Sequence, residues 1–250
     1  MSRILCFFSC GAASAVATKL AIAEFGDRCV IVNAFIQEEH PDNRRFADDC
    51  EKWFGMPIIR LRDTKYDASA IKVFETVGFI VGPSGAACTG RIKRGLLQNV
   101  EQPGDVLMLG FTSEEQNRMD NWIDSWPDKQ IVAPLIERGL TKEDCKAMVE
   151  RAGIKLPEMY LLGYDNANCI GCVKGGQGYF RAIREDFPEQ FERLAKAEEK
   201  VGAKILRHRS GPLAGQRFGL RDLPAGKAHR GEPLPTCGLL CELAEKEYAA

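Results

Sequence analysis

Three cysteines have the spacing and the neighbours that metal or redox chemistry requires. Cys88 stands beside the cationic segment Arg91–Arg94, and a Cys-x-x-Cys pair, Cys169 and Cys172, begins 81 residues further along. Two intervening residues let both sulfurs of such a pair turn to one ion, and the glycines around it leave backbone amides able to bond sulfur. The residues alone leave three hypotheses open: a metal centre, a redox pair, or thiols that fill a core.

A further pair, Cys237 and Cys241, stands near the end of the sequence with three intervening residues. Together with Cys169 and Cys172 it could form a four-sulfur zinc site. Tetrahedral sulfur ligation suits zinc and iron–sulfur clusters alike, so the spacing does not choose between them. A thioredoxin-like pair is disfavoured, because Cys169 and Cys172 precede a glycine-rich turn outside the early strand–helix unit.

The segment "SCGAAS", residues 9–14, follows a predicted strand and opens a predicted helix. Ser9 and Ser14 contribute hydroxyl groups, and Gly11 tolerates close approach of a ligand to the backbone. The first turn of the helix adds unpaired amides and the positive end of its dipole. This arrangement predicts a phosphate or sulfate site, although small residues here would also let a helix pack tightly on a strand.

The elements that must position these residues alternate between strand and helix. The pattern predicts apolar strands, most of them separated by helices, at 3–8, 29–36, 56–62, 105–111 and 129–136. This order predicts an α/β fold with a Rossmann-like, doubly wound, mostly parallel sheet whose ligands bind beyond the carboxyl ends of the strands. We expect a nucleotide-binding domain over 1–130 and a helical to irregular C-terminal part over 131–250, which carries the metal-binding cysteines.

Composition sets the class of protein and the compartment. The chain has 250 residues, 45% hydrophobic content and a net charge of −1, so no global field favours nucleic acid or membrane. The apolar run at 4–8 is too short for a signal-peptide core or a membrane span, which predicts a cytoplasmic protein. One local exception is the basic segment Lys204–Arg230, which is either a solvated face or an anion site for a nucleotide phosphate or an RNA backbone.

These motifs resemble those of the phosphoadenosine phosphosulfate (PAPS) reductase family, within the adenine nucleotide alpha hydrolase (PP-loop) superfamily. Residues 9–14 are similar to the superfamily's loop Ser-Gly-Gly-x-Asp-Ser, with Cys10 and Ala13 replacing the first Gly and the Asp. The segment 88–96 resembles the family's Cys-Cys-x-x-Arg-Lys-Val-x-Pro-Leu, with Ala87 in place of the first Cys. The segment 38–58 is similar to the family's second-strand and helix region.

Two later segments extend the resemblance. Gly110, Glu115 and Arg118 match the family's Gly-x-x-x-x-Glu-x-x-Arg strand end. Residues 237–239 resemble the centre of the Glu-Cys-Gly-Leu-His segment, which carries the reductase nucleophile. The resemblance therefore implies that Cys237 attacks the sulfur of an adenylyl sulfate, a role that a thiolate near cations would suit. Its neighbour Cys241 favours metal ligation by this pair instead, and both interpretations stay open.

The resemblance also implies a [4Fe–4S] cluster, with zinc as the second choice. Cluster-binding reductases use a Cys-Cys pair, then about eighty residues, then Cys-x-x-Cys. Cys88, Cys169 and Cys172 carry over as ligands, and Ala87 removes the fourth. Either Cys237 or Cys241 completes the site, with Cys241 taken as the ligand here, or the cluster keeps an open iron.

We therefore expect an adenine-nucleotide-binding (ATP, APS or PAPS), iron–sulfur-containing sulfonucleotide reductase-like oxidoreductase of sulfur metabolism. The loop 9–14 would bind sulfate or phosphate with help from Arg91, Lys93 and Arg118. A thioredoxin-like dithiol protein would supply electrons, and a homodimer is compatible with the sequence.

Two alternatives remain. The first is an ATP-dependent PP-loop sulfurtransferase that thiolates RNA, DNA or a small molecule, which explains the unfilled fourth ligand better but explains Ala13 worse, since a hard oxygen ligand for magnesium is lost. A nucleic-acid partner is thus an alternative that the sequence does not favour. The second is a non-catalytic module that binds nucleotide and zinc.

Overall fold

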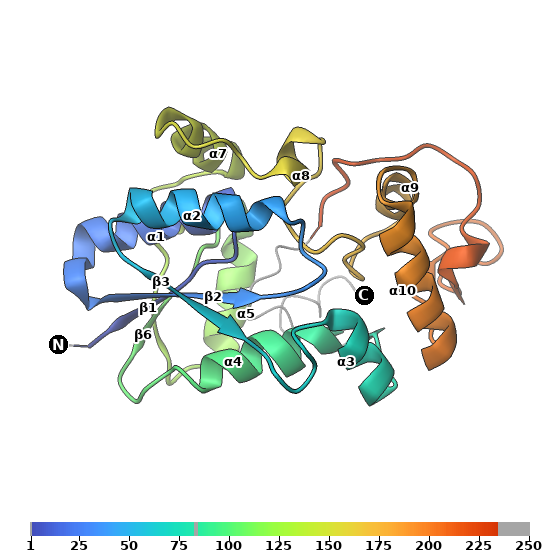
Figure 1. Ribbon diagram of the computed structural model, residues 1–250, viewed down its shortest axis with the longest axis horizontal. Coiled ribbons are helices and arrows are strands. Elements are labelled where there is room, and N and C mark those ends of the chain that lie inside the picture. Colours follow the sequence, from blue (N-terminus) through green and yellow to red (C-terminus); the bar gives the residue numbers. More distant parts are fainter. Residues whose placement is uncertain (1, 83–84, 235–250) are drawn as a thin grey trace.

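A five-stranded parallel sheet forms the centre of the N-terminal half (Figure 1). The computed structural model describes residues 2–82 and 85–234. The strands lie in the order β3-β2-β1-β6-β7, and each adjacent pair is parallel. Their bounds are β1 Ile4–Phe7, β2 Cys29–Phe35, β3 Ile58–Arg62, β6 Val106–Met108 and β7 Gln130–Val132. Since the strands are parallel, all five carboxyl ends meet at one edge.

Helices cover both faces of this sheet, as Figure 1 shows. One face carries α1 (Ala12–Phe25) and α2 (Asp42–Phe54), with α7 (Lys142–Arg151) packed on α1. The other face carries α4 (Gly95–Gln98) and α5 (Gln116–Ser125). The alternation of side chains along β1 divides the core between the faces: Ile4 and Cys6 pack on the α1 side, and Leu5 packs on the α5 side.

The helix ends follow sequence signals. Gly55 ends α2 in the left-handed conformation with φ 69°, which glycine adopts without strain. Thr141 and Asp144 form a capping box at the start of α7, as the sequence predicts. Gly55 thus fixes where the chain leaves α2 toward β3, and Thr141 fixes where it enters α7.

The C-terminal part is mainly helical and shares one apolar core with side chains of the segment 36–92. Its main helices are α9 (Gln177–Asp186) and α10 (Pro188–Val201), and α3 (Ala70–Val77) packs against α10. A two-stranded antiparallel hairpin, β8 (Leu206–Arg207) and β9 (Arg217–Phe218), follows α10. The smaller elements are β4 Val81–Gly82, β5 Gly85–Ala86, α6 Pro134–Glu137, α8 Glu158–Leu161, three 3-10 turns at 26–28, 113–115 and 220–222, and a π-helical segment Thr89–Arg94.

The structure confirms the predicted fold class, a doubly wound parallel α/β sheet with a helical C-terminal part. The predicted division at 130/131 stays a prediction; β7 at 130–132 still belongs to the sheet. Within the described residues, no helix combines the length and the apolar character needed to span a membrane.

We predict that Asp105→Asn destabilises the protein in a pH-dependent way. Arg3, before β1, donates from Nε and one terminal nitrogen to the two oxygens of Asp105, before β6, at 2.9 and 2.7 Å. This hydrogen bonding holds the pKa of the Asp105 carboxyl below its usual range. A lowered folded-state pKa contributes stability that is present above the ordinary carboxyl pKa, about 3.9, and is lost as pH falls through the folded value.

Chemical denaturation at several pH values checks this prediction. At pH 7 the free energy of unfolding should fall by about 2 kcal/mol, because a buried charged hydrogen bond is lost. The difference from the parent protein should shrink below about pH 4. The exposed Asp124→Asn is the matched control and should have little effect. A pH-independent loss in Asp105→Asn would contradict the assignment.

Candidate functional site

A pocket opens at the carboxyl edge of the sheet, where the parallel fold places ligand sites. It encloses about 1020 Å³ of empty space, including the part open to solvent. Its apolar lining includes Phe7, Val32, Ala34, Leu61, Leu97, Leu109 and Phe111. Its polar lining, called the polar half below, consists of Ser9, Gly11, Ser14, Lys93, Lys142, Asn166 and Asn168. We call this cavity the edge pocket.

The loop between β1 and α1 forms the floor of the polar half. The Ser14 hydroxyl donates to the Gly11 carbonyl at 2.9 Å and accepts from the Ser9 amide at 3.1 Å. Cys10 has φ 59°, in the left-handed region that side chains rarely adopt. The buried Cys10 thiol has a pKa raised well above its ordinary value by desolvation, so it stays protonated and fills the turn.

Tyr160 closes the loop from the opposite side. Its hydroxyl accepts a hydrogen bond from the Ala12 amide at 3.4 Å and lies where a side chain at Gly11 would make a tight 3.3 Å contact. Desolvation raises the pKa of Tyr160 to about 12, so the phenol is neutral at physiological pH. The first helical amide of α1 is thus bonded to a neutral group.

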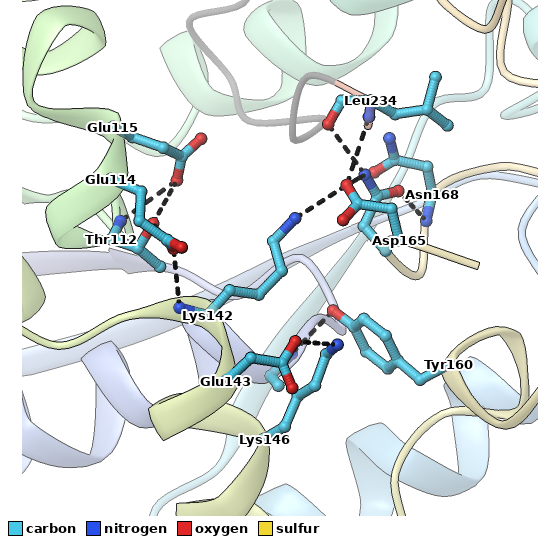
Figure 2. Close-up of polar contacts among 12 residues, drawn as sticks. Thr112, Glu114, Glu115, Lys142, Glu143, Lys146, Tyr160, Asp165, Asn168 and Leu234 are labelled. Carbon is cyan, nitrogen blue, oxygen red and sulfur yellow. Dashed lines mark hydrogen bonds and ion pairs between the residues drawn. The ribbon is translucent and has the colours of Figure 1, made fainter. Parts of the chain in front are cut away.

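Two lysines supply positive charge to the edge pocket. Lys93, from the π-helical segment, is 7% exposed and forms an ion pair with Glu39 at 3.7 Å. Lys142, at the start of α7, reaches across the pocket to Asp165 at 2.8 Å, as Figure 2 shows. Both ammonium groups belong to the lining of the pocket and each is paired with a carboxylate, so an anion that enters must share or displace that partner.

The predicted nucleotide-binding residues divide into two groups. Ser9, Gly11, Ser14 and Lys93 line the edge pocket, as the sequence analysis expects. Arg91 and Arg118 are not among its lining residues; Arg91 is exposed, and Arg118 lies over the Phe111 ring and pairs with Glu115.

Sequence reasoning did not select four further lining residues: Lys142, Tyr160, Asn166 and Asn168. Lys142 is the first residue of a helix that the sequence does predict, and its place is fixed by the packing of α7 on α1. The two asparagines directly precede the Cys-x-x-Cys pair. That proximity is the one sequence signal that could have found them.

A second cavity brings the three central cysteines together. Cys88, Cys169 and Cys172 line a cavity of about 820 Å³, with Thr89 and Glu39 among its other walls. We call it the cysteine cavity. Within residues 2–82 and 85–234, no group of three or more histidine, cysteine or acidic side chains is placed to hold a metal ion. The three sulfurs therefore share a cavity without converging on a preformed ligand set.

The cysteine cavity and the edge pocket have a common wall. Lys93 lines the edge pocket and pairs with Glu39, which lines the cysteine cavity. Asn168 lines the edge pocket, and the next residue, Cys169, lines the cysteine cavity. A ligand in one cavity thus lies one side chain away from the other.

Only the donor type of the cysteine cavity suits a soft metal centre, because Cys172 is buried but Cys88 and Cys169 are half-buried. Thiolate sulfur is the ligand that zinc and iron–sulfur clusters prefer. The hydroxyl of Thr89, which is 2% exposed and follows Cys88, has no hydrogen-bond partner among the described residues. An orphaned buried hydroxyl beside a thiol indicates a place for a further polar or ionic group. The predicted ligand Cys241 and the predicted nucleophile Cys237 lie outside the described residues.

Tyr179 holds the Cys-x-x-Cys turn from behind. Tyr179 is a buried residue of α9, and its hydroxyl accepts hydrogen bonds from the amides of Gly171 and Cys172, both at 3.0 Å. It also donates to the Cys169 carbonyl at 3.1 Å. The amides that the sequence analysis assigned to sulfur are thus bonded to this phenol, and the turn is fixed by a residue that sequence spacing did not select.

The end of the described chain, Leu234, is hydrogen-bonded to residues at the wall of the edge pocket. Asn166 donates to the Leu234 carbonyl at 3.1 Å, and the Leu234 amide donates to Asp165 at 3.3 Å (Figure 2). Asp165 is also the partner of Lys142. Leu234, the last residue that the structure describes, is therefore held beside the polar half of the edge pocket.

No protein-family model matches this chain, and no curated protein matches it either. The assignment of a function therefore depends on the fold, on the two cavities and on the motifs quoted above.

We predict that Tyr179→Phe destabilises the Cys-x-x-Cys turn. Loss of the hydroxyl leaves the Gly171 amide without its partner, while the Cys172 amide and the Cys169 carbonyl keep their hydrogen bond to each other at 3.0 Å. This should lower the free energy of unfolding by about 1–3 kcal/mol. Thermal denaturation measures this change. Tyr66→Phe is the matched control, because the Tyr66 ring is buried and its hydroxyl makes no hydrogen bond within the described residues. Equal melting temperatures for the two variants would contradict the role of Tyr179.

Proposed function

We propose that this protein is an adenine-nucleotide-binding, iron–sulfur-containing oxidoreductase of the sulfonucleotide reductase type. One observation carries the proposal: a pocket with apolar and cationic lining residues shares a wall with a cavity lined by Cys88, Cys169 and Cys172. The first cavity suits a nucleotide and the second suits a soft metal centre. Their proximity places a bound anion beside the cysteine sulfurs.

The edge pocket matches the two ends of a nucleotide. Phe7, Val32 and Leu61 offer an apolar surface for a base, and burial of a flat ring against such residues is favourable. The loop 9–14, the N-terminal end of the 14-residue helix α1 and Lys142 offer hydroxyl, dipole and charge to phosphate or sulfate.

The PP-loop resemblance gains support from two backbone positions. Position 10, where the superfamily loop has glycine, has a left-handed φ of 59°. Gly110 matches the glycine of the family's Gly-x-x-x-x-Glu-x-x-Arg segment. It packs so closely on the loop that a side chain there would stand 3.1 Å from the Ser14 Cα. The chain therefore keeps the geometry that a glycine-rich anion loop requires, even where the residue differs.

The cysteine cavity would hold a [4Fe–4S] cluster through Cys88, Cys169 and Cys172, with zinc as the second choice. When bound, such a cluster would act electrostatically or structurally next to the substrate anion. Lys93 would orient the anion from the common wall, while Tyr179 would keep the Cys169–Cys172 turn rigid.

Cys237 would act as the nucleophile. Leu234, three positions before Cys237 in the sequence, is held at the edge pocket. The Cys237 thiolate would attack the sulfur of the adenylyl sulfate, forming a sulfur–sulfur bond while the sulfur–oxygen bond to phosphate breaks and the nucleotide leaves. A dithiol protein such as thioredoxin would then reduce the thiosulfonate, releasing sulfite and forming a disulfide.

An ATP-dependent sulfurtransferase is the second candidate. The missing fourth ligand at Ala87 favours it, because an open iron is suited to carry an extra sulfur. However, among the residues that the structure describes, no carboxylate lines the edge pocket, and Ala13 lines it where the superfamily loop has an acid. Nucleic-acid-stimulated ATP hydrolysis would select this candidate over the reductase.

We predict that anaerobically purified protein contains iron and sulfide and binds adenylyl sulfates. Elemental analysis and titration calorimetry with APS, PAPS and ATP measure both properties, and a sulfite assay with a dithiol reductant measures turnover. One zinc per chain without iron would overturn the cluster. Absence of both adenylyl-sulfate binding and sulfite release would overturn the reductase, whereas tight binding without turnover would indicate a non-catalytic module.

We predict that Cys237→Ser keeps the full iron content and loses sulfite release, because the nucleophile is removed and the ligands remain. Cys241→Ser is the matched comparison and should lose iron if Cys241 is the fourth ligand. Iron analysis and the sulfite assay on both variants separate the two roles. Loss of iron in Cys237→Ser would contradict a purely nucleophilic role.

We predict that Lys142→Gln weakens nucleotide binding by roughly 10-fold or more, since a charged hydrogen bond to an anion contributes about 1.5–3 kcal/mol. Titration calorimetry measures the change. Lys52→Gln, exposed on α2 and outside the edge pocket, is the matched control and should bind nucleotide normally. Equal affinity in both variants would remove Lys142 from the site.

A further inference from the structure

A third cavity, in the C-terminal part, shares none of its lining with the edge pocket or the cysteine cavity. It encloses about 1170 Å³, including the part open to solvent. We call it the basic cavity; it is lined by Gln177, Gly178, Arg181, His208, Arg209, Ser210, Lys227, His229, Glu232 and Pro233. Three cations and two histidines face one carboxylate there.

The cations of the basic cavity are only partly neutralised. Arg181 donates to the Pro224 carbonyl and to the Gln177 side chain, which are both uncharged. Lys227 is exposed, and among the described residues it has no ion-pair partner. Only Arg209 has an acid, Glu232, at 2.5 Å. The cavity therefore keeps positive charge that an anionic ligand could neutralise.

The adjoining hairpin provides an independent sign of a missing anion. Arg207 of β8 lies directly opposite Arg217 of β9 in the antiparallel register. Like charges at directly opposed positions destabilise a strand pair. Burial, and then the neighbouring Arg207, lower the pKa of Arg217. No acidic side chain of the described residues pairs with either arginine, and Arg217 donates only to the carbonyls of Lys204 and Ile205.

The glycine-rich turn before α9 does not itself bind this anion. The carboxylate of Glu232, 6% exposed, accepts from the Tyr179 amide at 2.6 Å and so occupies the N-terminal end of α9. A side chain at Gly176 or Gly178 would collide with it. A ligand must therefore contact the side chains around the cavity and not the helix end.

We propose that the basic cavity and the β8–β9 hairpin bind the phosphate backbone of a single-stranded nucleic acid. The cations come from three separate segments. Arg181 belongs to α9, Arg207 and Arg209 to the hairpin, and Lys227 to the loop after residue 222, and most of them are exposed. A single phosphate needs donors that converge on one point. Spread cations, and arginines that can bond phosphate in a planar fork, suit successive phosphates of one strand.

Fluorescence anisotropy with a labelled single strand of about 20 nucleotides, as RNA and as DNA, tests this proposal between about 50 and 200 mM salt. The charge variant is Arg207→Gln with Lys227→Gln. We expect roughly 10-fold weaker binding at the lowest salt and a logarithmic salt slope that is smaller by about 2. The matched control is Lys52→Gln with Lys155→Gln, the same charge change at exposed sites on other elements, and it should bind like the parent.

Melting temperatures and calorimetric titration with AMP show whether the variants keep the fold and the edge pocket. The proposal is overturned if the parent protein does not bind either strand at low salt, or if the charge variant and the control lose affinity equally. Polyglutamate of similar length that competes as well as RNA would also overturn it, since the surface would then recognise any polyanion. Because AMP binding is measured separately, failure here leaves the reductase proposal untouched.

Discussion

Parallel pairing of β1 with both β2 and β6 is the constraint on which the rest of the molecule depends. It brings the carboxyl ends of β1, β2 and β6, at Phe7, Phe35 and Met108, to one edge of the sheet. The loop after β1 therefore meets Gly110, just after β6. At the other edge of the sheet, the bidentate contact between Arg3 and Asp105 joins the amino ends of β1 and β6. The edge pocket is a consequence of this pairing, because its lining comes from the ends of four strands.

The loop after β2 joins the sheet to the cysteine cavity. The Glu38 carbonyl accepts from the Ile170 amide at 2.8 Å, which places the Cys-x-x-Cys turn beside the sheet edge. The Glu38 carboxylate accepts from Ser69 and from the Ala70 amide, and so anchors the start of α3. A single residue thus aligns three segments that are far apart in the sequence, and Tyr179 then fixes the turn from within α9.

The sequence predicted the fold and part of the site for identifiable reasons. The strands of the sheet are apolar runs between helix signals such as Gly55 and Thr141, and such local patterns carry over directly into structure. Ser9, Ser14 and Lys93 line one pocket at the sheet edge, and their role as nucleotide ligands stays a prediction. Cys88, Cys169 and Cys172 share a cavity, which the family-like spacing indicated.

Other residues could not be predicted, because tertiary packing decides their place. Lys142 reaches the edge pocket only because α7 packs on α1, and Tyr179 reaches the Cys-x-x-Cys turn from within a buried helix. Arg91 and Lys93 are two residues apart, yet one is exposed and the other lines the pocket. Residues two apart on a helix point to different sides, so the difference follows from the helical segment Thr89–Arg94, which the sequence pattern did not predict.

The ion pair between Lys93 and Glu39 spans the partition between two cavities, and both side chains are 9% exposed. Water screens such a pair poorly, so the field of a charge on one side of the partition persists on the other. An arriving anion that draws the ammonium toward itself leaves the carboxylate less compensated near the sulfurs. An anion bound in the edge pocket would therefore alter the electrostatic potential of the cysteine cavity without any movement of the backbone.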